Sequence, residues 1–199
     1  MMHDQKESAI FQAAIDLFAQ KGFERTTMEE IAAVANVSKG TLFYRYTSKE
    51  ELFVKIVRHA LDRFFSTGKA AIAPIAKARD KLALILSLQI QLAFQNPNLA
   101  KLLFREVWGI VDRYPLLRQQ FDEYLQYLRV IIDEGIASGE LRELDSEMLA
   151  VAIFGMTASA TMQALLLPEI DQAKQMAEEL QRVILQGIEG GKQNDDSLS

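Results

Sequence analysis

Residues 22–53 read GFERTTMEEIAAVANVSKGTLFYRYTSKEELF, and capping residues within them predict short helices. Thr27 and Glu30 have the spacing of a capping box, in which a hydroxyl and a carboxylate three residues later each satisfy a backbone N–H group. Ser38 is placed to cap a further helix over Lys39–Tyr44. Small residues before Ser38 allow the two helices to pack closely together.

The segment between these helices is as informative as the helices themselves. Asn36 tolerates the left-handed backbone conformation in which many helices end. Val37 follows it and is expected to be buried in a three-residue turn. Ser48 opens a second capping box, so a long helix is predicted over residues 48–66. Two short helices joined by a three-residue turn have the geometry of a helix-turn-helix, which we predict at residues 27–46.

The second short helix has two different faces. Helical spacing points Leu42 and Tyr46 inward. The side chains predicted to point outward are Lys39, Thr41, Tyr44 and Arg45. Such side chains reach phosphates and base edges, and the helix N-terminus after Ser38 offers N–H groups and a positive dipole end to a phosphate. Gly40 allows the start of the helix to approach a DNA backbone closely, so the helix is predicted to read double-stranded DNA.

Composition excludes several classes of function. The chain has 199 residues, of which 49% are hydrophobic and 25% charged, enough for a buried core. It has no cysteine and two histidines, which excludes disulfides, thiolate metal sites and a cysteine nucleophile. No glycine-rich phosphate loop or serine nucleophile motif is present. We therefore expect no catalytic residues, no metal, no cofactor and no enzymatic activity.

Charge is distributed unevenly along the chain. The net charge is −5, so the protein as a whole does not attract DNA. Residues 36–49 nevertheless hold three basic residues and no acidic one, which predicts a small positive surface on an acidic protein. The polar N-terminus has no apolar run of signal-peptide length, which predicts a cytoplasmic protein.

Helical periodicity continues through the rest of the chain, without strand-like alternation or tandem repeats. The other predicted helices span residues 4–20, 77–95, 98–112, 116–138, 145–167 and 171–188. The fold class is therefore all-α. We predict a DNA-binding domain at residues 1–50, a helical effector-binding and dimerisation domain at 51–190, and a polar tail at 191–199.

Residues 148–167 form an uncharged run that allows two interpretations. The run is long enough to cross a bilayer, but it contains hydroxyl and amide side chains and no basic cluster flanks it. A helix that is apolar almost all round is more often buried on both sides, by its own domain and by a partner subunit. Gly155 and Ser159 would let two such helices approach closely. We expect a homodimer and no membrane insertion.

The stretch quoted above also carries a longer pattern at fixed spacing. Its matching residues are Thr26, Thr27, Ile31, Ala32, Ala35, Val37, Ser38, Gly40, Thr41, Phe43, Tyr44, Tyr46, Ser48, Lys49, Glu50 and Leu52. At these positions about the first 55 residues resemble the DNA-binding domain of the tetracycline-repressor (TetR) family. One departure is Tyr46, where phenylalanine is more usual, and its hydroxyl is expected to reach the surface.

The resemblance implies a homodimeric, all-helical, one-component transcription regulator. Its DNA contacts carry over to Thr27, Lys39, Thr41, Phe43, Tyr44 and Lys49. Lys39 and Thr41 are our choices for reading base edges, and Arg45 is expected on a phosphate. With the helix start added, the predicted DNA-binding set is Thr27, Ser38, Lys39, Gly40, Thr41, Phe43, Tyr44, Arg45 and Lys49.

The larger domain is where a small-molecule effector would bind. Its candidate contacts are Phe94, Phe104, Trp108, Tyr124, Tyr127 and Met156. Uncharged polar side chains also lie in the most apolar helices, at Gln89, Gln91, Thr157, Thr161 and Gln163. A buried polar side chain needs a partner, and a ligand, water or the other subunit could each serve. Because these helices carry few charges, the predicted pocket is apolar and its effector lipophilic.

These observations predict a ligand-responsive DNA-binding regulator. We expect a repressor that binds a palindromic operator as a dimer and is released by a small lipophilic effector. Two alternatives stay open: a small-molecule-binding helical scaffold with a vestigial helix-turn-helix, and a membrane protein that uses residues 148–167. A vestigial reader has no reason to keep residues 36–49 free of acidic side chains, and a soluble dimer without detergent excludes the membrane protein.

Overall fold

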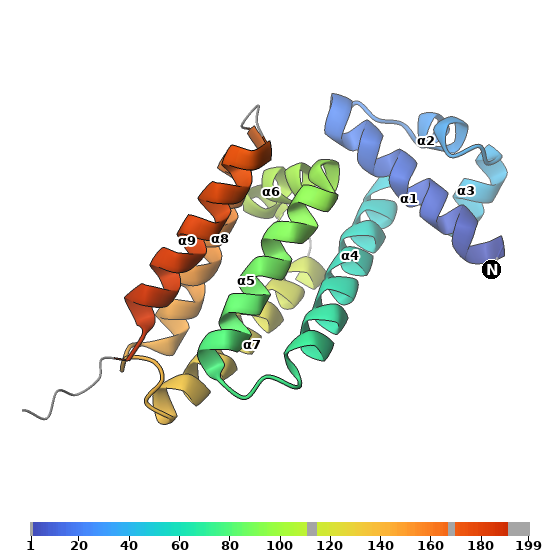
Figure 1. Ribbon diagram of the computed structural model, residues 1–199. Coiled ribbons are helices and arrows are strands. Elements are labelled where there is room, and N and C mark those ends of the chain that lie inside the picture. The colour runs from blue at the N-terminus through green and yellow to red at the C-terminus, as the bar shows by residue number, and fades with distance from the viewer. Residues whose placement is uncertain (1, 111–114, 167–169, 191–199) are drawn as a thin grey trace, which may run out of the picture. The chain divides into compact units, whose positions relative to one another are not determined.

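The computed structural model describes residues 2–110, 115–166 and 170–190, with the side chains of 2–4, 104–110, 115–117, 170–174 and 177 excepted. Within those ranges the chain forms helices and no strand (Figure 1). The helices are α1 (Met2–Lys21), α2 (Met28–Val34), α3 (Lys39–Arg45), α4 (Lys49–Ile72), α5 (Ala78–Gln95), α6 (Pro97–Ile110), α7 (Pro115–Ala137), α8 (Ser146–Leu166) and α9 (Ile170–Ile188). The predicted all-α fold is confirmed.

Among the described residues the predicted helix limits agree with the observed ones to within two residues, except at α4. Residues 111, 112 and 167, also predicted to be helical, lie outside the described residues. Helix α4 was expected over residues 48–66 but continues to Ile72. No proline interrupts it before Pro74, and the amide of Ala73 still donates to the carbonyl of Lys69 at 3.2 Å. Because a residue before proline disfavours the helical conformation, the helix ends where Pro74 forces it to.

Backbone packing divides the chain into two units. Unit 1 comprises residues up to Ser66 together with Leu92–Phe121, and unit 2 comprises Thr67–Gln91 and the chain from Asp122 on. Three helices, α4, α5 and α7, contribute residues to both units.

Unit 1 has one hydrophobic core beneath its short helices. Apolar side chains of α1, α2, α3, the first half of α4 and α6 meet in it, and its largest fully buried members include Phe18, Phe53 and Ile31. The rings of Phe18, Phe23 and Phe53 pack in tilted and edge-to-face pairs with centroids 5.1–6.1 Å apart. Such a core holds the helix-turn-helix as a rigid body on α1 and α4.

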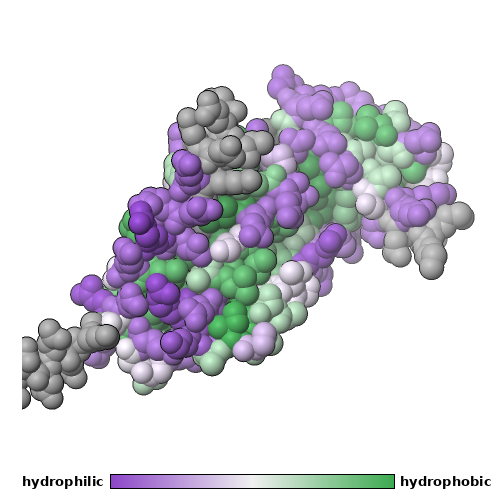
Figure 2. Space-filling view, viewed as in Figure 1, coloured by the Kyte–Doolittle hydropathy of each residue, from purple (hydrophilic) through white to green (hydrophobic). Residues whose placement is uncertain are grey.

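Unit 2 packs α8 against α9 through small side chains. The buried face of α8 consists of Ala150, Ile153, Thr157, Ala158, Thr161 and Ala164. In the view of Figure 2, hydrophilic residues predominate over α9, whereas hydrophobic residues reach the surface over α5. The last helix is held by a short antiparallel bridge, in which Arg142 N donates to Ile188 O at 3.0 Å and Gly190 N to Glu140 O at 2.9 Å.

Candidate nucleic-acid interface

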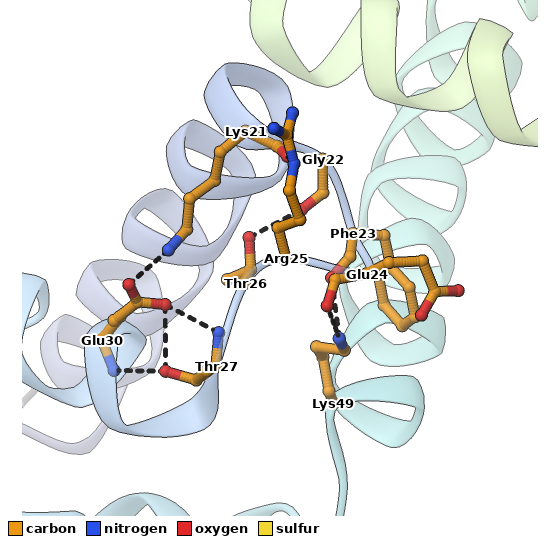
Figure 3. A network of polar contacts seen from close by, with 9 residues as sticks. All are labelled: Lys21, Gly22, Phe23, Glu24, Arg25, Thr26, Thr27, Glu30 and Lys49. Atoms are coloured by element: carbon orange, nitrogen blue, oxygen red, sulfur yellow. Dashed lines mark hydrogen bonds and ion pairs between the residues drawn. The ribbon is translucent and has the colours of Figure 1, made fainter.

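The N-terminus of α2 is fixed by the predicted capping box. Thr27 N donates to Glu30 Oε2 at 2.8 Å, and Glu30 N donates to Thr27 Oγ1 at 3.3 Å (Figure 3). Lys21, the last residue of α1, forms an ion pair with the same carboxylate. The Lys21 hydrogen bond, followed by the bonds from the backbone and side chain of Thr27, lowers the pKa of Glu30 to about 2.

The turn between α2 and α3 is a Schellman motif. Asn36 has a positive φ of 53°, as its type and position predict. Asn36 N donates to Ala33 O at 3.2 Å and Val37 N to Ala32 O at 3.0 Å, which satisfies the last carbonyls of α2. Val37 was expected to be buried and is partly buried against the unit 1 core. The turn is therefore held by backbone hydrogen bonds together with the packing of Val37.

Leu42 and Tyr46 point inward as spacing predicted, whereas of the residues predicted outward Lys39 and Tyr44 are exposed and Thr41 and Arg45 are half-buried. Ser38 caps the helix by accepting from Thr41 N at 3.0 Å, and its hydroxyl lies 2.7 Å from Thr41 Oγ1. Leu42 is fully buried, whereas Tyr44 is 92% exposed and Phe43 38% exposed. A large aromatic residue held almost wholly in solvent on a rigid helix is available for a partner.

Tyr46 differs from expectation at its hydroxyl group. The residue is only 3% exposed, and its hydroxyl donates to Glu7 Oε1 of α1 at 2.9 Å instead of reaching the surface. Burial, followed by the Glu7 hydrogen bond, raises the pKa of the Tyr46 phenol. The hydroxyl that distinguishes this residue from phenylalanine therefore connects the end of α3 to α1.

The cations around α3 have different environments. Lys39 forms an exposed ion pair with Glu29 of α2, with Nζ and Oε1 2.6 Å apart, and its ammonium lies 5.5 Å from the centroid of the Phe43 ring. The Lys39 hydrogen bond is the main cause of a lowered pKa at Glu29. Arg45 is half-buried and Gly40 exposed.

Lys49 lies in a more enclosed position than a free surface lysine. Its ammonium donates to the carbonyl oxygens of Phe23 at 2.7 Å and Glu24 at 3.2 Å, and lies 4.5 Å from the centroid of the Phe23 ring (Figure 3). The predicted DNA-binding residues thus lie on α3 and on the N-terminal ends of α2 and α4, all within unit 1.

Sequence reasoning did not place two charged residues, Glu29 and Arg25, on this surface. The carboxylate of Glu29 forms an ion pair with the ammonium of Lys39. Because the two residues are ten positions apart in the sequence, spacing did not predict this pair. Arg25 is exposed beside Thr27, and its Nε donates to Lys21 O at 2.7 Å.

The predicted effector contacts are divided between the two units. Phe94 is half-buried in unit 1, and the side chains of Phe104 and Trp108, on α6, lie outside the described residues. In unit 2, Tyr124 is buried, donates to Gln89 Oε1 at 2.9 Å and packs edge-on against Phe154.

Tyr127 and Met156 have different surroundings. The half-buried ring of Tyr127 lies 5.5 Å from the ammonium of Lys69, and Met156 is 41% exposed on α8. Of the unit 2 candidates, Tyr124 is therefore the most buried, and its hydroxyl already has a partner within the chain.

The buried hydroxyl groups of α8 have found partners within their own helix. Thr157 Oγ1 donates to Ile153 O at 2.8 Å, and Thr161 Oγ1 donates to Thr157 O at 2.7 Å. Neither hydroxyl needs a ligand or a second subunit. Across the described parts of the chain, no group of three acidic or histidine side chains is placed to hold a metal ion.

Two known protein-domain families match parts of the chain. Residues 10–56 match the pattern described as "Bacterial regulatory proteins, tetR family", and residues 76–162 match "Tetracyclin repressor-like, C-terminal domain". These two ranges cover the helix-turn-helix and much of unit 2.

Individual proteins are similar over most of their length. The HTH-type transcriptional regulator RutR of Escherichia coli K12 is 31% identical, covering 92% of this chain and 90% of its own. The fatty acid metabolism regulator protein of Bacillus subtilis 168 is 31% identical over 75% of this chain and 78% of its own. The crystal structure of FadR from Bacillus subtilis in complex with stearoyl-CoA has a TM-score of 0.73 and 27% identity, over 91% of this chain and 98% of that one. The chain therefore belongs to the TetR family of bacterial transcriptional regulators, all-α proteins that bind DNA and respond to ligands.

Proposed function

We propose that the exposed face of α3 reads the major groove of an operator. The observation that carries this proposal is the contrast between Leu42, which is fully buried, and Tyr44, which is 92% exposed, on one short capped helix. Lys39, Gly40, Thr41, Phe43 and Arg45 complete the face. Ser38 lies at its start, and Thr27 and Lys49 flank it from the ends of α2 and α4. Ammonium, guanidinium and hydroxyl groups on one helix suit phosphates and base edges.

The active species is a homodimer that pairs through α8 and α9. One face of α8 is exposed in the single chain and carries small or apolar residues, including Met148, Ala152, Ser159 and Leu166, with the half-buried Gly155 among them. No atom lies within 4 Å of a Cβ built on Gly155, so a second helix can approach closely there. Two copies of α3 would then bind the half-sites of a palindromic operator, with centres about 34–36 Å apart or somewhat more.

The same helix is the candidate membrane span in the described part of the chain. α8 is long and apolar enough to cross a bilayer, and only about a third of its most apolar stretch is buried. Its opposite face packs on its own unit through Ala150 and Ile153, which favours burial by a partner over insertion into lipid. We therefore propose a cytoplasmic dimer without membrane contact.

The effector is a lipophilic small molecule that releases the protein from DNA. The fatty acid regulator of Bacillus subtilis supports an acyl compound, because it is named for fatty acid metabolism and FadR of that organism was solved with stearoyl-CoA. The proposed contacts are Phe94, Phe104, Trp108, Tyr124, Tyr127 and Met156. A ligand causes release only if it binds the DNA-incompetent conformation more tightly than the competent one.

The functional division predicted from the sequence is part of this proposal. Residues 1–50 bind DNA, residues 51–190 bind the effector and dimerise, and residues 191–199, outside the described part of the chain, form a polar tail. The chain acts as a repressor and not as an enzyme.

Fluorescence anisotropy with DNA from upstream of its own coding sequence tests this function. We expect salt-dependent binding of one dimer to a palindrome and loss of binding when the half-sites are scrambled. Stearoyl-CoA should release the DNA, whereas free coenzyme A should not. Equal affinity for the intact and scrambled sequences would favour a helical scaffold with a vestigial reader, and failure of stearoyl-CoA alone would refute only the acyl effector.

A further inference from the structure

Glu29 is an acidic residue on a surface that is proposed to bind DNA. It is the second residue of α2, two positions after the N-cap Thr27. The neighbouring Glu30 has a structural role, because its carboxylate completes the capping box with Thr27 and forms the ion pair with Lys21 (Figure 3). Glu29 takes no part in that capping box, and its carboxylate binds a residue of the next helix instead.

The partner of Glu29 is Lys39, the first residue of α3. Nζ of Lys39 and Oε1 of Glu29 are 2.6 Å apart, and the two side chains are 64% and 53% exposed, respectively. The ring of Phe43, one helical turn after Lys39, has its centroid 5.5 Å from the same ammonium. A cation and an anion are thus presented to solvent side by side, at the N-terminal ends of both helices of the helix-turn-helix.

Both members of this ion pair can form further hydrogen bonds. An ammonium has more N–H donors than the bond to Glu29 uses, and a carboxylate can accept several hydrogen bonds at once. Beside the phosphates of DNA a carboxylate is repelled, whereas at the edges of the bases it is a useful acceptor. By holding the ammonium of Lys39, Glu29 also makes a phosphate a less favourable partner for that ammonium.

A G·C base pair presents the complementary groups in the major groove. Guanine offers the acceptors N7 and O6, and cytosine offers the N4 amino group as a donor on the same edge. An A·T pair also offers acceptors, but it places the thymine methyl group against the two charges, which lose water there without gaining a hydrogen bond. The ammonium therefore suits guanine and the carboxylate suits cytosine, and the ion pair itself stays intact.

We propose that Glu29 and Lys39 act as one unit that reads a G·C base pair in each half-site, with Lys39 donating to guanine and Glu29 accepting from cytosine. This inference rests on the proposed reading of DNA by α3, and it adds a specificity-determining residue on α2. Glu29 lowers the affinity for DNA in general, because a carboxylate repels phosphates, and raises the preference for one base pair.

The base preference at each operator position tests this inference. The palindrome from upstream of the coding sequence is altered one base pair at a time, in both half-sites together, and affinities are measured by competition in fluorescence anisotropy. Replacing the G·C pair with A·T should weaken binding of the wild type by at least about tenfold. In Glu29→Ala and in Lys39→Met this discrimination should be largely lost at the same base pair. The double variant should lose no more discrimination than either single variant.

Glu50→Ala is the matched control for the change in charge. Glu50 is also exposed and is the second residue of its helix, α4, so its replacement changes the net charge equally without removing the ion pair. The base preference of Glu50→Ala should equal that of the wild type at every position. Glu29→Gln keeps an acceptor and adds an amide donor, so it should shift the preference at the affected base pair toward A·T, because an amide suits N6 and N7 of adenine.

The results that would overturn the inference are distinguishable from failure of the proposed function. Discrimination lost at different base pairs in Glu29→Ala and Lys39→Met would show two separate contacts. An unchanged base preference in Glu29→Ala, or a wild-type preference for A·T at the affected position, would show that Glu29 does not read cytosine. Each of these results leaves the proposed function intact, whereas absence of operator binding by the wild type would refute the proposed function itself.

Discussion

Replacing Tyr44 with alanine should weaken operator binding strongly while leaving the fold intact. The side chain is 92% exposed, so its removal uncovers almost no core and leaves no buried group unpaired. We expect the free energy of unfolding to change by less than about 0.5 kcal/mol, as for other surface substitutions. In a chain of this size the melting temperature should therefore shift by no more than about 2 °C.

The expected loss of DNA affinity is much larger. A hydrogen bond from a hydroxyl to a charged group such as a phosphate contributes about 1.5–3 kcal/mol, which corresponds to about tenfold to a hundredfold in affinity. A dimer loses this contact in both half-sites, so binding to the full operator should weaken by at least about a hundredfold.

Fluorescence anisotropy and thermal unfolding should be measured on the same preparations. Tyr44→Phe removes the hydroxyl and keeps the ring, so it separates phosphate binding from stacking. Leu42→Ala is the contrasting control, because truncating this fully buried side chain should lower the free energy of unfolding by about 2–5 kcal/mol. If Tyr44→Ala binds the operator with wild-type affinity at physiological salt, the exposed face of α3 is not the reading surface.

Three further predictions concern charge and packing. Glu30→Gln should melt at a lower temperature than the wild type at neutral pH, because the Lys21 ion pair holds the folded-state pKa of Glu30 at about 2, below its ordinary 4.5. In thermal scans this difference in melting temperature should disappear as the pH falls from 4.5 toward about 2, and a difference independent of pH would contradict the prediction. Glu29→Gln should increase DNA affinity about twofold to fivefold, because the Glu29 carboxylate competes with phosphate for the ammonium of Lys39. An equal gain in affinity in a Lys39→Met background would show that Glu29 does not act through Lys39. Gly155→Leu should keep the fold of the single chain and raise the dimer dissociation constant by about tenfold or more in sedimentation experiments. An unchanged dissociation constant would place the dimer interface elsewhere.

The local structure of the helix-turn-helix could be predicted because the residues that determine it are close together in sequence. The capping box at Thr27, the left-handed turn at Asn36 and the cap at Ser38 each involve residues no more than five positions apart, and each is present in the structure. The inward face of α3 followed from helical spacing for the same reason.

The region predicted to bind the effector was less predictable. Thr157 and Thr161 needed partners, but only the coordinates show that their hydroxyls donate to carbonyls one turn earlier in their own helix. Tyr124 and Gln89 each stood out as an aromatic or a polar residue in an apolar helix, while their hydrogen bond joins residues 35 positions apart. Composition can indicate that a region is apolar, but it does not determine which side chains meet within it.

By itself the sequence therefore determined the helices, their caps and the outward face of α3, because these depend on interactions within one or two turns of the chain. Only the tertiary structure decided the partners of long side chains. Lys49 binds carbonyls 25 and 26 residues away, and Tyr46 donates to a carboxylate 39 residues away. The sequence does not show which of many polar groups a long, flexible side chain will meet. The packing of α1 and α4 around one core decides which of them lies close enough to bond.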